Sequence, residues 1–166
     1  MYLALYDHSY AQIIAEQNMN HRGLFLTIQT REAKDFQSSK FVPCNLAQTY
    51  QFDQIVREIS RKNLGKTVIF CAGENTFVQM KTIFLIGAHL ILTYRVDADA
   101  AATVFESLND PFEGSLSFDN LESIRNCWYS LACAQKMNWL DFWAVFETQD
   151  DHDGCIKLDE YVHYTR

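Results

Sequence analysis

The stretch from Lys66 to Leu92, KTVIFCAGENTFVQMKTIFLIGAHLIL, constrains the fold more than any other part of the chain. Its first part, Thr67–Phe70, is short, apolar and partly β-branched, which predicts a buried strand. A polar turn follows, and the apolar residues of Thr76–Thr93 recur with helical spacing. A buried strand joined by a short turn to a long helix is typical of the βα units that build parallel sheets. The sequence therefore predicts an α/β fold.

Further elements of the same kind flank this unit. Asn45 is a good N-cap for a helix whose apolar residues recur at i, i+3, i+4 and i+7 from Phe52, and Gly65 is its predicted stop. The other predicted elements are strands at Tyr2–Tyr6 and Leu24–Ile28, a helix at Ala100–Leu108 capped by Asp97 or Asp99, a helix at Asn120–Lys136, and a short helix at Trp139–Phe146. Together they predict one domain over residues 1–166, with a mostly parallel sheet covered by helices on both faces.

The charge balance limits the kinds of partner. The chain has 21 acidic and 14 basic residues and a formal net charge of −7, which argues against nucleic acid or an anionic membrane. The most apolar run, Thr82–Tyr94, is shorter than a bilayer requires, so we expect a buried helix. The first residues lack a basic region followed by an apolar run, so no signal peptide is expected.

Cysteines and histidines give no sign of a metal or disulfide framework. The five cysteines are odd in number and widely spaced, which favours a reducing compartment, the cytoplasm or nucleus. No metal-ligand spacing links His8, His21, His89, His152 and His163, so no cofactor is expected. On its apolar helix, His89 is predicted to be a hydrogen-bonded core residue. We predict that four aromatic side chains pack inside the domain: Trp128, Tyr129, Trp139 and Trp143. The alternative for Trp139 or Trp143 is a position on a surface that faces a partner domain.

Cys71 follows the predicted strand where a cysteine-dependent phosphatase holds its nucleophile, in the pattern H-C-x5-R. Such a site needs helix N–H groups that cradle a phosphate and an arginine that grips two of its oxygens. Phe70 stands at the histidine position, Phe77 at the arginine position, and Glu74 beside Gly73 adds negative charge to the turn. These departures predict a vestigial loop in which the cysteine is a small buried residue. The alternative is an active phosphatase or a sulfurtransferase that uses this cysteine.

The acidic segment near residues 149–157 has the spacing of a calcium loop. With Gly154 at loop position 6, Asp151 and Asp153 fall at positions 3 and 5, and Glu160 at position 12. Gln149 stands at position 1, where a carboxylate is usual. The residues that follow are too few for a stable exiting helix. We therefore predict a solvated acidic loop, inserted into the domain. A calcium-responsive adaptor acting through residues 149–160 is the alternative.

Four stretches together resemble the N-terminal half of the cell-division-cycle-fourteen dual-specificity protein phosphatases: VPCNLAQTYQF, FLIGAHLILTYRVDADAA, WLDFWAVF and LDEYVHYTR. Pro43 and Asn45–Ala47 match the family's P-x-N-L-A helix start. Ile83–His89 matches an A-F-L-I-G-A-Y helix, and Asp159–Thr165 matches E-E-Y-E-H-Y-E. These matches are collinear and the resemblance covers nearly the whole chain.

This resemblance implies a three-layer, phosphatase-like fold that lacks the chemistry of catalysis and helps to select substrate. In that case a second, catalytic half carries out catalysis, either in the same polypeptide or as a separate protein. Alternatively, the chain is a stand-alone pseudophosphatase module. Basic phosphoproteins are the implied substrates, and the cell cycle is the implied setting. A substrate groove is implied at Asp159, Glu160, Tyr161 and His163, although Val162 and Thr165 stand where the family has further acidic residues.

Overall fold

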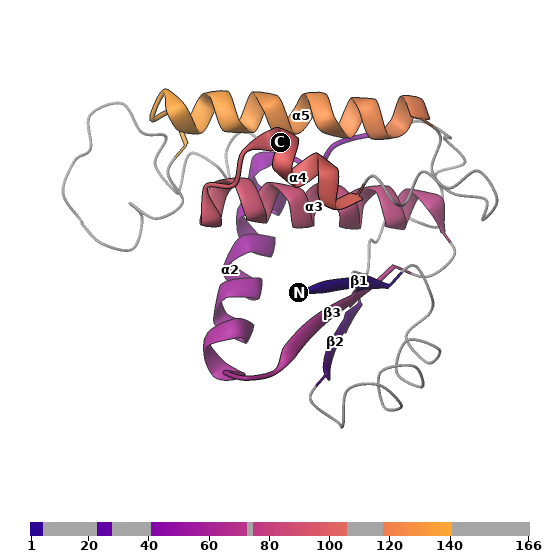
Figure 1. Cartoon of the computed structure of the whole chain (residues 1–166), viewed down its shortest axis with the longest axis vertical. Helices are drawn as coiled ribbons and strands as arrows, with labels where there is room; N and C mark the ends of the chain where they lie inside the picture. The colour runs from indigo at the N-terminus through magenta and orange to yellow at the C-terminus, as the bar shows by residue number, and fades with distance from the viewer. Residues whose placement is uncertain (5–22, 28–40, 73–74, 106–117, 141–166) are drawn as a thin grey trace.

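The computed structural model describes residues 1–4, 23–27, 41–72, 75–105 and 118–140 (Figure 1). Within these ranges the elements follow the order β1 (Tyr2–Ala4), β2 (Gly23–Thr27), α2 (Leu46–Lys62), β3 (Thr67–Cys71), α3 (Thr76–Tyr94), α4 (Ala98–Phe105) and α5 (Phe118–Lys136). Mixed helices and parallel strands agree with the α/β fold that the sequence predicts. The short helix predicted at Trp139–Phe146 lies almost entirely outside the described residues.

The three strands form one parallel sheet in which β3 lies between β1 and β2. Leu3, Phe70 and Leu26 stand side by side in this register, and all three contribute to the hydrophobic core. Since α2 connects β2 to β3, these elements form a βαβ unit. The predicted ends of the outer strands at Tyr6 and Ile28 lie outside the described residues. Helical cover on the second face of the sheet stays a prediction.

α2 begins where its predicted cap stands. The Asn45 side chain accepts a hydrogen bond from the Gln48 backbone N–H at 2.8 Å, and the Gln48 side chain accepts one from the Asn45 N–H at 3.1 Å. This reciprocal capping box satisfies two N–H groups that the first turn would otherwise leave without partners. The helix ends at Lys62, and Gly65 adopts a φ of 81° in the turn before β3. Glycine adopts this backbone conformation without the Cβ clash of other residues.

α3 is buried on all sides rather than on the one broad face that its sequence pattern predicts. Its residues from Met80 to His89 are all buried, since the sheet, α2, α4 and α5 surround the helix (Figure 1). Within the described ranges it is the one helix long and apolar enough to cross a membrane, and most of it is buried inside the protein. The length argument against a membrane span is therefore wrong for the full helix, Thr76–Tyr94. The expectation of a buried helix is confirmed.

α4 and α5 cover α3 on the side away from the sheet (Figure 1). Asp97 begins α4, because its Oδ1 accepts a hydrogen bond from the Asp99 backbone N–H at 2.9 Å. α5 approaches α3 closely at Gly87, where an added Cβ would lie 2.2 Å from the indole ring of Trp128. The indole Nε1–H donates to the Phe84 carbonyl oxygen at 3.0 Å, so the predicted packing role of Trp128 is confirmed.

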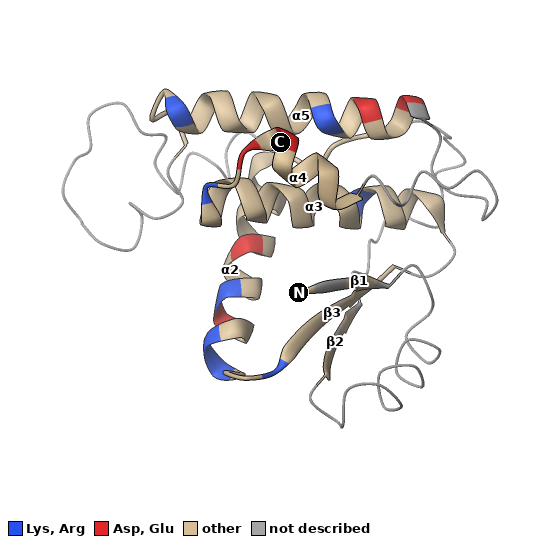
Figure 2. Ribbon diagram, viewed as in Figure 1, with Lys and Arg blue, Asp and Glu red and all other residues tan. Residues whose placement is uncertain are grey.

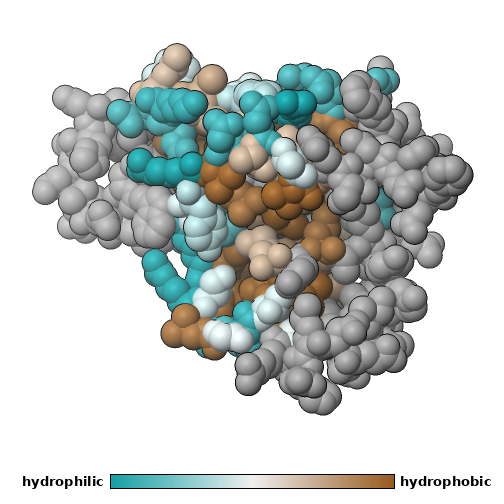
Figure 3. Space-filling view, viewed as in Figure 1, coloured by the Kyte–Doolittle hydropathy of each residue, from teal (hydrophilic) through white to brown (hydrophobic). Residues whose placement is uncertain are grey.

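Polar and apolar residues separate clearly on the surface. In Figure 2 the charged residues lie mainly on α2, on α5 and at helix ends, while the sheet is nearly uncharged. Figure 3 shows apolar residues gathered in the middle of the same face, below α4 and around β1. Trp139 does not pack as predicted, because 58% of its surface remains exposed in the bend after α5.

Candidate functional site

Cys71 is the last residue of β3, with a fully buried side chain. It lies in register with Ala4 of β1 and Thr27 of β2. Because side chains alternate along a strand, Cys71 points to the opposite face of the sheet from Phe70, whose ring lies in the core beneath the helices. With an exposed fraction of 0%, the thiol is closed to a substrate in this conformation.

The N-terminus of α3 already holds an acceptor of its own. The Asn75 side-chain oxygen accepts hydrogen bonds from the backbone N–H groups of Phe77, at 3.0 Å, and Val78, at 3.2 Å. In a phosphatase loop, N–H groups at this end of the helix point at the phosphate. Here a neutral carboxamide uses two of them, so a phosphate would first have to displace the cap.

The arginine position is filled by a buried ring. Phe77 has an exposed fraction of 5%, and the Lys81 Nζ lies 4.6 Å from the centroid of its ring. This separation is that of a cation–π contact. A phenyl ring cannot make the two parallel charge-assisted hydrogen bonds that a guanidinium makes to phosphate. The described part of the loop thus lacks an accessible thiol, an open helix N-terminus and an arginine at the sixth position.

Several predicted site residues lie outside the described ranges. Within the Cys71 loop these are Gly73 and Glu74. The calcium candidates Asp151, Asp153 and Glu160 and the groove candidates Asp159, Tyr161 and His163 also lie outside. Their roles stay predictions. Among the described residues, no three His, Cys, Asp or Glu side chains come together as metal ligands would.

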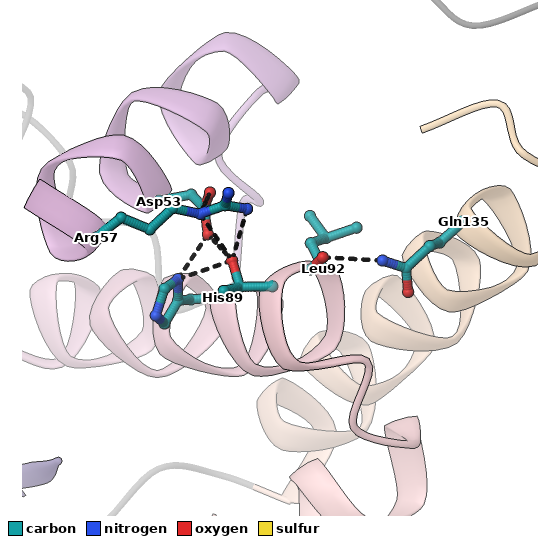
Figure 4. A network of polar contacts seen from close by, with 6 residues as sticks. Asp53, Arg57, His89, Leu92 and Gln135 are labelled. Atoms are coloured by element: carbon teal, nitrogen blue, oxygen red, sulfur yellow. Dashed lines mark hydrogen bonds and ion pairs between the residues drawn. The ribbon is translucent and has the colours of Figure 1, made fainter. Parts of the chain in front are cut away.

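A buried polar network joins α2 to α3 (Figure 4). Asp53 stands at its centre: its Oδ2 lies 2.7 Å from Arg57 Nε, and its Oδ1 lies 2.6 Å from His89 Nδ1. The Thr93 hydroxyl donates to Asp53 Oδ1 and accepts from the Arg57 Nη2 at 3.0 Å. This arrangement confirms that His89 is a hydrogen-bonded core residue. Because all four side chains are buried, the network positions the two helices and does not meet a substrate.

The sequence analysis missed this network, although its signal is present. Asp53 and Arg57 stand four residues apart on one helix, as do His89 and Thr93 on the other. Such pairs share a helix face. All four interrupt or border predicted apolar faces, and buried polar groups require partners. That the two pairs face each other could not be read from spacing within either helix.

A pocket of about 260 Å³ lies at the shared C-terminal end of α3 and α5. Its lining consists of Arg95, Val96, Asp97, Ala132, Gln135, Lys136 and Asn138. Gln135, one of these lining residues, donates a hydrogen bond from its Nε2 to the Leu92 carbonyl oxygen at 2.9 Å (Figure 4). Two lining residues, Arg95 and Asn138, have left-handed backbone angles, with φ of 54° and 57°. The sequence analysis did not identify this pocket.

A second, exposed cluster links α4 to α5. Arg125 Nη2 lies 2.6 Å from Asp99 Oδ1, and the Tyr129 hydroxyl donates to the same carboxylate oxygen. Tyr129 and then Arg125 hold the pKa of Asp99 below its ordinary value. The same hydrogen bond to Asp99 raises the pKa of Tyr129. Tyr129 therefore contacts α4 through its hydroxyl, while 37% of its surface remains exposed.

Comparison with known families gives one match over most of the chain. The family model described as "dual specificity protein phosphatase, N-terminal half" matches residues 4–139. The matched region contains all the described helices, the loop at Cys71 and all of the residues that line the pocket. A comparison with curated protein sequences found no match.

Proposed function

The chain belongs to the dual specificity protein phosphatase family as an N-terminal half, and from this premise we propose that it is a non-catalytic half that selects substrates. One observation carries the proposal: the N-terminus of α3 is closed by Asn75, beside a buried Cys71 and the Phe77 ring. The helix end that would bind phosphate in a catalytic half is thus used for structure.

The finer assignment is to the cell-division-cycle-fourteen type. It is supported by the collinear matches at Pro43–Ala47 and Ile83–His89, both within the matched region. The first forms the capped start of α2, and the second lies in the buried centre of α3. This assignment also implies a three-layer phosphatase-like fold, in which further helices cover the second face of the sheet.

The proposed partners follow from that assignment. A catalytic half with the pattern H-C-x5-R would pack against the chain, either in the same polypeptide or as a separate protein of the cytoplasm or nucleus. Large apolar side chains that remain exposed in the described part, such as Ile55, Val104 and Trp139, provide surface for such packing. Basic phosphoproteins are the proposed substrates, and Asp159, Glu160, Tyr161 and His163 are the proposed groove.

Steady-state kinetics of the catalytic half, with and without this chain, test the proposal. The substrates are a phosphoserine peptide with basic residues downstream, the same peptide with alanine in their place, and a small aryl phosphate. We expect the chain to raise kcat/KM at least tenfold for the basic peptide and to change it little for the other two. Equal kcat/KM values with and without the chain, for all three substrates, would contradict the proposal.

A further inference from the structure

The pocket at the C-terminal ends of α3 and α5 carries positive charge on an acidic protein. Two lining residues are cations, Arg95 and Lys136, and one is an anion, Asp97, which leaves a local charge of +1 where the chain carries −7. Figure 2 shows a basic residue at this end of each helix. Within the described ranges the side chains of Arg95 and Lys136 make no hydrogen bond or ion pair. The Asp97 side chain, by contrast, caps α4. Both cations therefore remain available to an anion.

The backbone places both a cation and an amide at positions where helices commonly use glycine. Arg95 ends α3 in the left-handed region, with φ of 54° and ψ of 32°, and Asn138 follows α5 with φ of 57°. Asparagine tolerates this conformation better than most residues, but arginine gains nothing from it. Strained residues of this kind gather at binding sites, because the surrounding structure holds a side chain where a ligand needs it.

Several carbonyl groups at these helix ends already have hydrogen-bond donors within the protein. The last carbonyl groups of a helix carry partial negative charge, which would repel an anion. Here Leu90 O accepts from Val96 N at 3.2 Å, Leu92 O accepts from Gln135, and Ala134 O accepts from Trp139 N at 2.9 Å. These three carbonyl groups point at donors of the protein, and the positive charge of the pocket comes from the side chains of Arg95 and Lys136.

Buried polar contacts fix the geometry of the pocket. Thr93, two residues before Arg95, belongs to the network around Asp53 that joins α3 to α2. The hydrogen bond from Gln135 to Leu92 joins α5 to α3 through a residue that lines the pocket. Both contacts lie within one turn of the end of α3 (Figure 4). Such support preorganises a binding site, since less conformational freedom is lost when a ligand binds.

Large apolar side chains stand next to lining residues in the sequence. Tyr94, Met137 and Trp139 are each bonded along the chain to a lining residue, and their exposed fractions are 59%, 58% and 58%. Tyr94 is anchored on its inner side by an edge-on contact with His89, with ring centroids 5.4 Å apart. Aromatic and methionine side chains beside cations are typical of surfaces that bind peptides.

We propose that this pocket binds the phosphate of a phosphorylated peptide segment, at a site separate from the Cys71 loop. The phosphate lies between Arg95 and Lys136, and neighbouring residues of the peptide lie on Tyr94 and Trp139. The choice of a phosphopeptide rests on the proposed function, because the substrates and products of a protein phosphatase carry such groups. The pocket would hold one phosphorylated position of a substrate while another is hydrolysed by the catalytic half.

Binding of the full chain to a peptide array tests this. Each peptide has a central phosphoserine flanked by varied residues, and matched arrays carry serine or glutamate at the centre. The tightest phosphopeptide is then titrated calorimetrically with Arg95→Gln, Lys136→Gln and Trp139→Ala. Arg61→Gln is the matched control, because Arg61 is exposed in the last turn of α2 and lines no part of the pocket. Thermal unfolding verifies that each variant is folded.

We expect phosphopeptides to bind more tightly than their serine counterparts, with at least a tenfold loss for Arg95→Gln and for Lys136→Gln and less than twofold for Arg61→Gln. No preference for phosphopeptides, or equal affinity in the two pocket variants and the native chain, would overturn the proposal. Equal binding of the glutamate peptides would overturn the choice of phosphate. Because this experiment involves no catalysis, its failure is distinct from failure of the proposed function, which appears in the kinetics of the catalytic half.

Discussion

Arg95 holds a backbone conformation that glycine adopts more easily, at the end of α3, the most buried of the described helices. A left-handed conformation costs a residue with a Cβ about 1 kcal/mol relative to glycine. The same residue supplies half of the positive charge of the pocket. Stability and binding therefore make opposite demands on this one position.

Substitution of this residue separates the two demands. We predict that Arg95→Gly raises the free energy of unfolding by about 1 kcal/mol, because it relieves the left-handed strain. It should at the same time abolish peptide binding. Urea unfolding measures the first effect. The matched change Arg61→Gly, inside α2, should lower stability instead, since glycine is a poor helix former. A loss of stability in Arg95→Gly would contradict the account of strain.

The contact between Tyr129 and Asp99 predicts a pH dependence. Because the folded-state pKa of Asp99 is lowered, first by Tyr129, the contact stabilises the fold above the ordinary pKa of 3.8. This stabilisation is lost as the pH falls through the lower, folded-state value. In Tyr129→Phe the pKa of Asp99 should rise toward 3.8, as measured by carboxyl carbon chemical shifts. Tyr94→Phe is the control. An unchanged pKa in Tyr129→Phe would contradict the assigned cause.

At the scale of elements, the contact between α3 and α5 depends on glycine at position 87, which has no side chain. An added Cβ at Gly87 would overlap the Trp128 ring, which is itself held by a hydrogen bond to Phe84. We predict that Gly87→Ala destabilises the domain by about 3 kcal/mol, since a well-packed core cannot accept the added volume without backbone shifts. Chemical denaturation measures this. When Gly87→Ala is combined with Trp128→Phe, part of the lost stability should be recovered, because the smaller ring leaves room for the added methyl group. Equal stability of the native chain and Gly87→Ala would contradict the close packing of Gly87 against Trp128.

The network between α2 and α3 makes a second prediction at this scale. Asp53→Asn leaves the Arg57 guanidinium buried without its carboxylate, so we expect the free energy of unfolding to fall by about 3–5 kcal/mol. The double variant Asp53→Leu, Arg57→Met removes both charges and should lose less. Denaturant unfolding of the set gives the coupling between the two residues. Equal losses in the single and double variants would contradict the claim that the unpaired charge of Arg57 causes the loss of stability.

Prediction from sequence succeeds here where the signal is local. Asn45 marks the start of α2 with a capping box, and Asp97 marks the start of α4. Prediction from sequence fails where the structure depends on contacts between segments that are far apart in the chain. The all-round burial of α3, and the pairing of Asp53 with His89, depend on which helices surround one another. The pocket was missed for the same reason, since Arg95 and Lys136 come together only when α3 lies beside α5.

At the scale of the whole molecule, the family and the loop chemistry agree. The chain belongs to a family of phosphatase N-terminal halves, and its own β3, Cys71 and α3 follow one another in the order of a phosphatase loop. In this chain the loop serves packing and capping, while an unrelated pocket lies at the opposite end of α3. The central claim is therefore that the chain binds but does not catalyse.

Hydrolysis of a small aryl phosphate by the purified chain tests this claim most directly, with Cys71→Ser as the matched variant. The account predicts the same rate for both proteins, equal to the rate without protein, because Cys71 is buried and no arginine stands at the sixth position after it. Turnover by the native chain that disappears in Cys71→Ser would contradict the account and establish an enzyme that uses this cysteine.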